Sequence, residues 1–209
     1  MFHNWIYYTE EPILPEDFCN KTIDFFEERP EKEPGMVGSG LDYNTKRSTD
    51  LAYSMRSKFK EQYQEFIPYI TTAVSQYVAL LEQHYPPLYY SFERRAKIPV
   101  IQVQRTCPGE YFNWHHDDHE QGGYIRGYTF IFYLNTITDK GYTEFYDGTT
   151  IQPKQGHCLI FPSTWNYVHR GVAPATETKY IATGWGYYKN GIVINTHDSN
   201  GRIHPDNHQ

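Results

Sequence analysis

The chain has 209 residues, enough for one sizeable hydrophobic core, so we expect a single domain over residues 1–209. Its 19 basic and 25 acidic residues give a formal charge of −6 without a long basic run, so neither nucleic acid nor an anionic membrane is an expected partner. No segment reaches the roughly 20 apolar residues that span a bilayer, and the opening "MFHNWIYYTEEP" does not have the order of a secretory signal. We therefore predict a cytoplasmic protein.

Two helices are predicted in the first part of the chain. Residues 15–29 begin with a proline suited to a first helical turn, and their apolar residues follow near helical spacing. Residues 56–84 carry apolar side chains at steps of three and four, which predicts a long amphipathic helix with Pro68 as the place for a bend. The glycine-rich, polar segment 31–49 between them predicts a loop or loose hairpin, and it would suit a mobile flap.

Short β-branched and aromatic runs replace the helical pattern from about residue 96 to residue 196. They include "IPVIQVQR", "YTFIFYLN", "HCLIFP" and "YIATGWGYY", and Gly, Pro, Asp or Asn separate them. Helices followed by about eight strands predict an α+β fold, in which a jelly-roll core is buttressed by a helical N-terminal part over about 1–95. The polar tail 197–209 is expected to be poorly ordered.

The segment "YFNWHHDDHE" at 111–120 crowds metal-binding side chains together. Side chains at i and i+2 of a strand share one face, so an H-x-D presents one imidazole beside one carboxylate. Two pairings satisfy this spacing: His115 with Asp117, or His116 with Asp118. A third ligand must come from elsewhere, and His169 lies near the end of a later predicted strand. Two histidines and one carboxylate form the facial triad that suits iron(II).

The surrounding motifs are similar to those of the iron(II)- and 2-oxoglutarate-dependent dioxygenases, in particular the prolyl 4-hydroxylase-like branch. The resemblance covers about 98–188 and is weaker in the N-terminal half. The matching runs are "CPGEYFNWHHD", "RGYTFIFYLN", "GYTEF", "IQPKQGHCLIFP" and "HRGVAPATETKYIATGW". The family usually keeps two residues between its aromatic, here Phe112, and the first histidine. The resemblance therefore assigns the metal ligands to His115, Asp117 and His169, on a double-stranded β-helix of the jelly-roll or cupin-like type.

The resemblance also implies sites for a cosubstrate and a substrate. Lys179, ten residues after His169, would pair with the distal carboxylate of 2-oxoglutarate, because a buried carboxylate needs a cation. Tyr133 and Thr183 would add hydroxyl donors, and Arg126 and Trp185 would face the substrate. One departure is that Thr106 and Cys107 stand where many prolyl hydroxylases carry a tyrosine.

The other histidines and acids of the chain receive no ligand role. The three neighbours of the H-x-D pair are expected to be exposed: His116, Asp118 and His119. His157 is expected to be an ordinary strand residue. The tail histidines would at most collect adventitious metal.

The function implied is an Fe(II)-, 2-oxoglutarate- and O2-dependent hydroxylation of an unactivated C–H bond. The first choice of substrate is a prolyl residue in a peptide or protein, because the arginine and tryptophan positions match and the 31–49 loop would fold over an extended chain. A free amino acid or small metabolite is the alternative. A jelly roll that only binds metal and a partner is the second alternative, although a buried cation after His169 would then have no purpose. The sequence does not indicate an oligomeric state.

Overall fold

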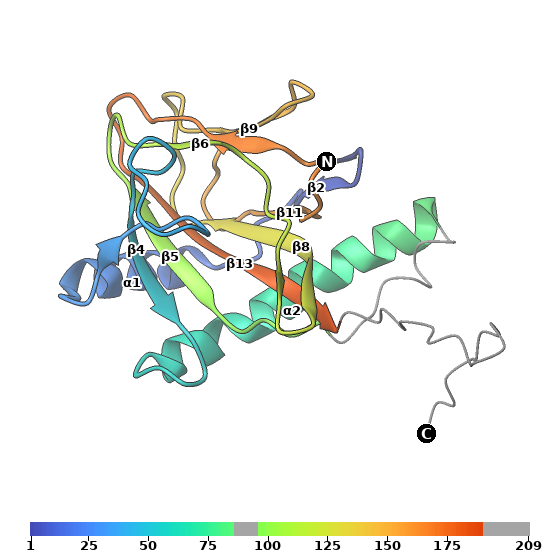
Figure 1. Ribbon diagram of the computed structural model, residues 1–209, viewed down its shortest axis with the longest axis horizontal. Coiled ribbons are helices and arrows are strands. Elements are labelled where there is room, and N and C mark those ends of the chain that lie inside the picture. Colours follow the sequence, from blue (N-terminus) through green and yellow to red (C-terminus); the bar gives the residue numbers. More distant parts are fainter. Residues whose placement is uncertain (86–95, 190–209) are drawn as a thin grey trace, which may run out of the picture.

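The computed structural model describes residues 1–85 and 96–189, and they form two β-sheets with two helices packed on the larger one (Figure 1). The helices are α1 (Glu16–Glu28) and α2 (Lys60–His84). The larger sheet has the order β1 (Phe2–His3), β2 (Ile6–Tyr8), β11 (Cys158–Pro162), β8 (Tyr124–Tyr133), β13 (Lys179–Lys189), β5 (Ile101–Thr106), β4 (Thr49–Tyr53), β3 (Glu33–Pro34), and β7 (Glu120–Gln121) pairs with β8. The smaller sheet has the order β10 (Thr150–Ile151), β9 (Thr143–Phe145), β12 (His169–Gly171), β6 (Phe112–His115).

Both predicted helices form, and both use the expected apolar face. Helix α2 buries residues at steps of three and four, and these side chains pack against the outer face of the larger sheet: Tyr63, Phe66, Ile70, Ala73, Tyr77 and Leu81. Because these contacts hold the helix on the sheet, it continues through Pro68 as a single element. None of the described helices is both long enough and apolar enough to cross a membrane.

The two sheets face each other as the walls of a jelly roll, which confirms the predicted α+β class. A second apolar cluster fills one end of the space between them and includes Tyr133, Phe145 and Phe161. The other end is polar. In β5, Ile101 and Val103 point to the helices, whereas Gln102, Gln104 and Thr106 line a cavity between the sheets. The polar residues on the inner face of β5 therefore mark the boundary between the apolar core and a polar cavity that could bind a ligand.

The N-terminal part contains more strand than its sequence predicts. β1 and β2 extend one end of the larger sheet, and β3 and β4 extend the other. The segment between Pro34 and Thr49 returns across the open side of the jelly roll, where it pairs with the start of β6 through a bridge of Lys46 with Phe112. This segment, residues 35–48, lies within the loop predicted at 31–49, and we call it the flap. The expected tail at 197–209 lies outside the described residues.

Candidate active site

The structure brings the three predicted ligands together at one end of the smaller sheet. His115 on β6 and His169 on β12 are direct cross-strand partners, and their ring centroids lie 4.2 Å apart. Asp117 stands between them, with Oδ1 3.9 Å from Nε2 of His115 and Oδ2 3.8 Å from Nε2 of His169. All three ligand atoms lie within 4.8 Å of one another, and they are the only such group among the residues that the structure describes.

The two imidazoles are held with Nε2 turned toward the shared point. Nδ1 of His115 lies 2.7 Å from the carbonyl oxygen of Asn113, and Nδ1 of His169 lies 3.0 Å from that of Tyr167. A carbonyl only accepts, so each Nδ1 carries the proton and each Nε2 keeps a free electron pair. Burial, with a smaller contribution from His169, lowers the pKa of His115 to about 3, so this ring is neutral at physiological pH. Two imidazoles that present Nε2, together with one carboxylate, fit a divalent iron ion.

The Asp117 side chain is positioned in the site by a different contact from the one that the sequence argument assumed. β6 ends at His115, so strand alternation does not carry the carboxylate onto the histidine face. Thr129 on β8 holds it instead: its hydroxyl donates to Oδ2 of Asp117 at 2.7 Å and contacts the Ser163 hydroxyl at 2.9 Å. Burial alone would raise the pKa of Asp117, but the two imidazoles and the Thr129 hydroxyl lower it below its ordinary value.

The alternative pairing does not converge. His116 and Asp118 are exposed at the edge of the cavity beside the triad, whereas Asp117 is buried. His157 lies away from the triad, where its Nδ1 contacts the carbonyl oxygen of Thr9 at 2.9 Å and its ring stacks on Tyr8. The geometry therefore favours the pairing of His115 with Asp117.

A cavity of about 600 Å³ opens beside the triad, and the flap and strands β5, β8 and β13 line it. Lys179 stands in its wall at the start of β13 and is 5 % exposed. Its ammonium donates one hydrogen bond, to the carbonyl oxygen of Gly141 at 3.0 Å. Burial lowers the pKa of Lys179 to about 8. Because an ammonium has three donors, two remain for a ligand, which fits the carboxylate end of 2-oxoglutarate.

The two predicted hydroxyl donors are less well placed. Tyr133 is fully buried and does not appear among the described residues of the cavity wall; its hydroxyl contacts that of Thr143 at 2.8 Å, and Thr143 lines the cavity. Thr183 does line the cavity, but its hydroxyl donates to the carbonyl oxygen of Phe130 at 2.8 Å. In this arrangement Thr143 presents the hydroxyl at the wall, with Tyr133 behind it. The sequence reasoning passed over Thr143, although it lies in the matching "GYTEF" run.

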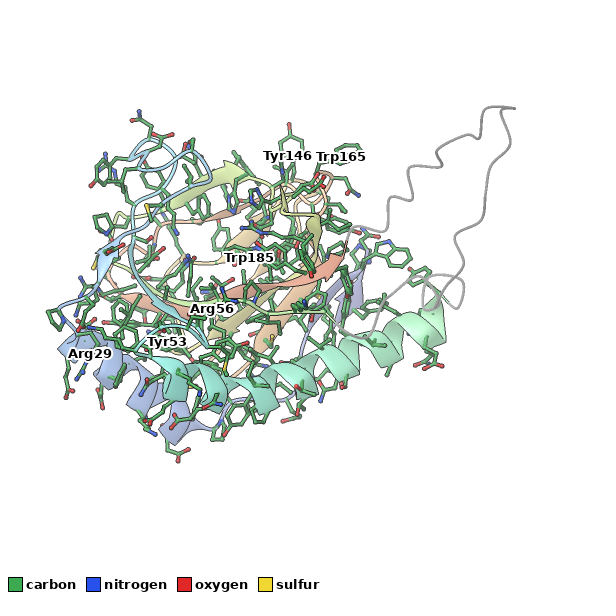
Figure 2. All side chains as sticks on the ribbon, turned by 60° about the horizontal axis from the view of Figure 1, so that its bottom comes forward. Arg29, Tyr53, Arg56, Tyr146, Trp165 and Trp185 are labelled. Atoms are coloured by element: carbon green, nitrogen blue, oxygen red, sulfur yellow. The ribbon has the colours of Figure 1, made fainter. Side chains whose placement is uncertain are left out.

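Arg126 and Trp185 lie together on the cavity wall as a stacked pair. The guanidinium carbon of Arg126 is 3.8 Å from the Trp185 ring centroid, and its Nε donates to the Tyr187 hydroxyl at 2.7 Å. Trp185 is half-buried and lies near the middle of the view in Figure 2, whereas Tyr146 and Trp165, both strongly exposed, lie at the edge of the molecule. The indole of Trp185 is turned toward the triad, because its interaction with the Asp117 carboxylate helps to lower the pKa of that group. The pair therefore offers a flat cationic wall beside the triad.

Comparisons with known proteins agree with this geometry. Residues 101–187 match the family model described as 2OG-Fe(II) oxygenase superfamily. No curated protein sequence matches the chain. Among solved structures, a viral collagen prolyl hydroxylase from Paramecium bursaria Chlorella virus-1 has a TM-score of 0.63 at 18 % identity, covering 88 % of this chain and 96 % of its own.

Two further structures share the fold. A Pseudomonas putida prolyl-4-hydroxylase has a TM-score of 0.61 at 19 % identity, covering 87 % of this chain and 92 % of its own. A Trichoplax adhaerens prolyl hydroxylase, in complex with a hypoxia inducible factor oxygen degradation domain peptide fragment, has a TM-score of 0.65 at 16 % identity, covering 89 % and 84 %. These likenesses show a prolyl hydroxylase-like fold.

The matched segment contains both strands of the triad and the buried lysine. Residues 101–187 are thus similar to the 2OG-Fe(II) oxygenase superfamily, and the chain has a fold like that of the prolyl hydroxylases. It is an oxygenase that uses Fe(II), with 2-oxoglutarate and O2 as cosubstrates.

Proposed function

We propose that this oxygenase hydroxylates a prolyl residue in a peptide or protein. In this proposal His115, Asp117 and His169 hold Fe(II), and the observation that carries it is the convergence of their ligand atoms within 4.8 Å beside a polar cavity. When bound, the iron supplies the activation of O2, by which 2-oxoglutarate becomes succinate and CO2 and one oxygen atom enters a substrate C–H bond.

The protein's own residues would position both small molecules. Lys179 would donate its two remaining hydrogen bonds to the distal carboxylate of 2-oxoglutarate, and burial makes this pairing strong because water does not compete. Thr143 would add a hydroxyl at the same wall. Thr129 would keep the Asp117 carboxylate turned toward the metal.

Two features support a peptide as the substrate. The flap forms part of the cavity wall, and the lining residues Arg47 and Asp118 are exposed, so an extended chain would have a path past the triad. The stacked Arg126 and Trp185 form one wall of that path, and a flat aromatic and guanidinium surface suits a proline ring and its neighbouring peptide carbonyl. The peptide bound to the Trichoplax adhaerens enzyme gives a precedent within the same fold.

The cosubstrate assignment is tested first. Under anaerobic conditions, Fe(II) and 2-oxoglutarate together should give a weak visible absorption band with the wild-type chain. Lys179→Ala should lose the band at the same 2-oxoglutarate concentration but still bind the metal. Lack of a band in the wild type would contradict the proposal.

The substrate assignment needs a separate measurement. Succinate formation should rise when a proline-rich peptide is added and should not rise with free proline. An increase with free proline alone would favour the alternative, in which the substrate is an amino acid or other small metabolite.

A further inference from the structure

The cavity contains a second buried lysine that the proposed reaction does not use. Lys46, in the flap, is 3 % exposed and lines the cavity. Its ammonium forms a salt bridge with Oδ2 of Asp50 at 2.7 Å, and Ser48 donates to the other oxygen of that carboxylate at 2.7 Å. A buried cation is costly unless it is fully paired, so every N–H group of the Lys46 ammonium needs a hydrogen-bond partner.

The flap holds Lys46 firmly beside the triad. The backbone N–H of Arg47 donates to Tyr111 at 2.8 Å, and that of Asn113 donates to Thr45 at 2.7 Å, so the flap is paired with the strand that carries His115. The Lys46 ammonium lies 5.2 Å from the ring centroid of Phe112, and that ring stacks on His115 with centroids 3.4 Å apart. Lys46 therefore occupies the wall on the His115 side of the cavity.

The Lys46 ammonium has donors to spare. It has three N–H groups, and the structure gives it one hydrogen bond, to Asp50. Lys179 is in the same position, with one bond to a backbone oxygen and two donors left. Lys179 has a ligand in the proposed reaction, the distal carboxylate of 2-oxoglutarate. Lys46 has none, and burial keeps water from serving its remaining donors freely.

The charges on the cavity wall point to a ligand of the same kind. Apart from the triad, the wall carries four cationic side chains and a single carboxylate: Lys46, Arg47, Arg126 and Lys179, against Asp118. The chain as a whole carries −6, so this concentration of positive charge is local to the cavity. A positively lined cleft attracts and orients anions. Asp50, which is not in the wall, neutralises one of these cations through its pair with Lys46, and one distal carboxylate on Lys179 then still leaves one positive charge in excess.

We propose that Lys46 binds a carboxylate carried by the substrate, so that the enzyme selects an acidic residue close to the proline that it hydroxylates. This inference rests on the proposed function and narrows its substrate class. The cation is fixed by its pairing with Asp50 and by the flap, so it is already in place when an acidic chain enters. Arg47 at the exposed rim would attract the same chain over a longer range.

Two substitutions separate binding from a purely structural salt bridge. Lys46→Met removes the cation and leaves the Asp50 carboxylate to repel an anion. Asp50→Asn removes the carboxylate and leaves the cation free to attract one. If the pair only supports the flap, both changes should weaken peptide binding alike. If Lys46 binds the substrate, they should act in opposite directions. Lys21→Met, which breaks an exposed pair with Glu65 far from the cavity, controls for the change in net charge.

The probes are three capped peptides that differ only beside the proline: Gly-Glu-Pro-Glu-Gly, its Gln counterpart and its Lys counterpart. Free L-proline tests whether a small molecule can supply the carboxylate instead. Binding is measured by calorimetric titration of protein loaded with Mn(II) and 2-oxoglutarate without oxygen, so the result does not depend on turnover. Succinate formation is followed separately, so a failure of the proposed function is visible by itself.

The wild type should bind the Glu peptide at least about tenfold more tightly than the Gln peptide. Lys46→Met should lose that preference, Asp50→Asn should keep or increase it, and Lys21→Met should leave it unchanged. The affinity for 2-oxoglutarate should stay the same in all of them. If Lys46→Met does not fold, the double variant Lys46→Met/Asp50→Asn removes the cation without leaving a buried carboxylate, and it should also lose the preference.

Three results would overturn the inference. These are equal weakening by Lys46→Met and Asp50→Asn, weaker 2-oxoglutarate binding in Lys46→Met, or a wild type that does not prefer the Glu peptide, including one that binds none of the three. Binding of free proline that depends on Lys46, without binding of the Glu peptide, would also overturn it, because the carboxylate would then come from a small molecule.

Discussion

The hydrogen bond from Thr129 to Asp117 should set the affinity of the site for iron. It is 2.7 Å long, both partners are buried, and the acceptor is the carboxylate of the triad. A hydrogen bond to a charged group contributes about 1.5–3 kcal/mol, and each 1.4 kcal/mol changes an equilibrium constant about tenfold. Thr129→Val keeps the shape and removes the donor, so it should weaken Fe(II) binding about 10- to 100-fold, the range found for residues that orient metal ligands.

The same substitution has a second effect that must be separated from the first. Ser163 is fully buried and contacts the Thr129 hydroxyl at 2.9 Å, so Thr129→Val leaves its hydroxyl without that partner. An unsatisfied buried group costs about 1–3 kcal/mol of folding free energy. The double variant Thr129→Val/Ser163→Ala should recover much of this stability, measured by urea unfolding of the metal-free protein, but should not recover metal affinity.

The assay is anaerobic competition for Fe(II) against a coloured chelator, without 2-oxoglutarate. Thr183→Val is the matched control, because its hydroxyl lines the same cavity but donates to the Phe130 carbonyl and not to a triad residue. Its Fe(II) affinity should equal that of the wild type. An unchanged Fe(II) affinity in folded Thr129→Val, or an equal loss in Thr183→Val, would refute the reasoning.

The two H-x-D pairings predict different results in the same assay: Asp117→Ala should abolish Fe(II) binding, and the exposed Asp118→Ala should change it by less than about twofold. For Lys179, whose pKa burial lowers to about 8, the protonated form binds the carboxylate, so 2-oxoglutarate affinity in calorimetric titrations should fall as pH rises through about 8. Lys179→Met should bind weakly at every pH. Gly35→Ala would place a Cβ 2.1 Å from Oγ of Ser48 and should weaken binding of the Glu peptide, whereas nothing lies within 4 Å of such an atom in Gly38→Ala.

Each of these expectations has a contrary result. Loss of Fe(II) binding in Asp118→Ala with retention in Asp117→Ala would mean that the other pairing forms the site. A 2-oxoglutarate affinity that is flat around pH 8 in the wild type would separate Lys179 from the cosubstrate. Equal effects of Gly35→Ala and Gly38→Ala on peptide binding would show that the flap does not hold Lys46 in place for the substrate.

The sequence predicted the helices and the jelly roll because their signals are local. Helix α2 buries Tyr63, Phe66 and Ile70 at steps that the sequence displays directly, and β5, β8, β11 and β13 follow short β-branched and aromatic runs. The antiparallel pairing of β3 with β4 agrees with the alternative of a loose hairpin at 31–49. The sequence did not predict that β4 continues to Tyr53, and it does so because the edge of β5 supplies hydrogen-bond partners for it.

The three residues proposed as metal ligands from the sequence lie together in the structure, but the sequence argument for them was incomplete. Spacing alone allowed two pairings, and strand alternation was the argument for either. The structure ends β6 at His115 and turns Asp117 inward through Thr129, a residue on another strand. Contacts of this kind depend on how β6 and β8 are placed relative to each other. A single chain read in order carries no local signal for them.

Lys46 and Lys179 show which kind of site residue the sequence alone can identify and which kind it cannot. Lys179 sits in a strand at a fixed distance from His169, so a motif can find it. Lys46 belongs to a segment whose composition is that of a solvated loop, where a lysine is ordinarily exposed. It is buried because the flap pairs with Phe112 and because Asp50 and Ser48 surround its ammonium. If substrate choice depends on Lys46, then sequence motifs carry the residues of the reaction, whereas tertiary packing of the flap determines the substrate specificity. Chains with the same motifs but a different flap should therefore prefer different peptides.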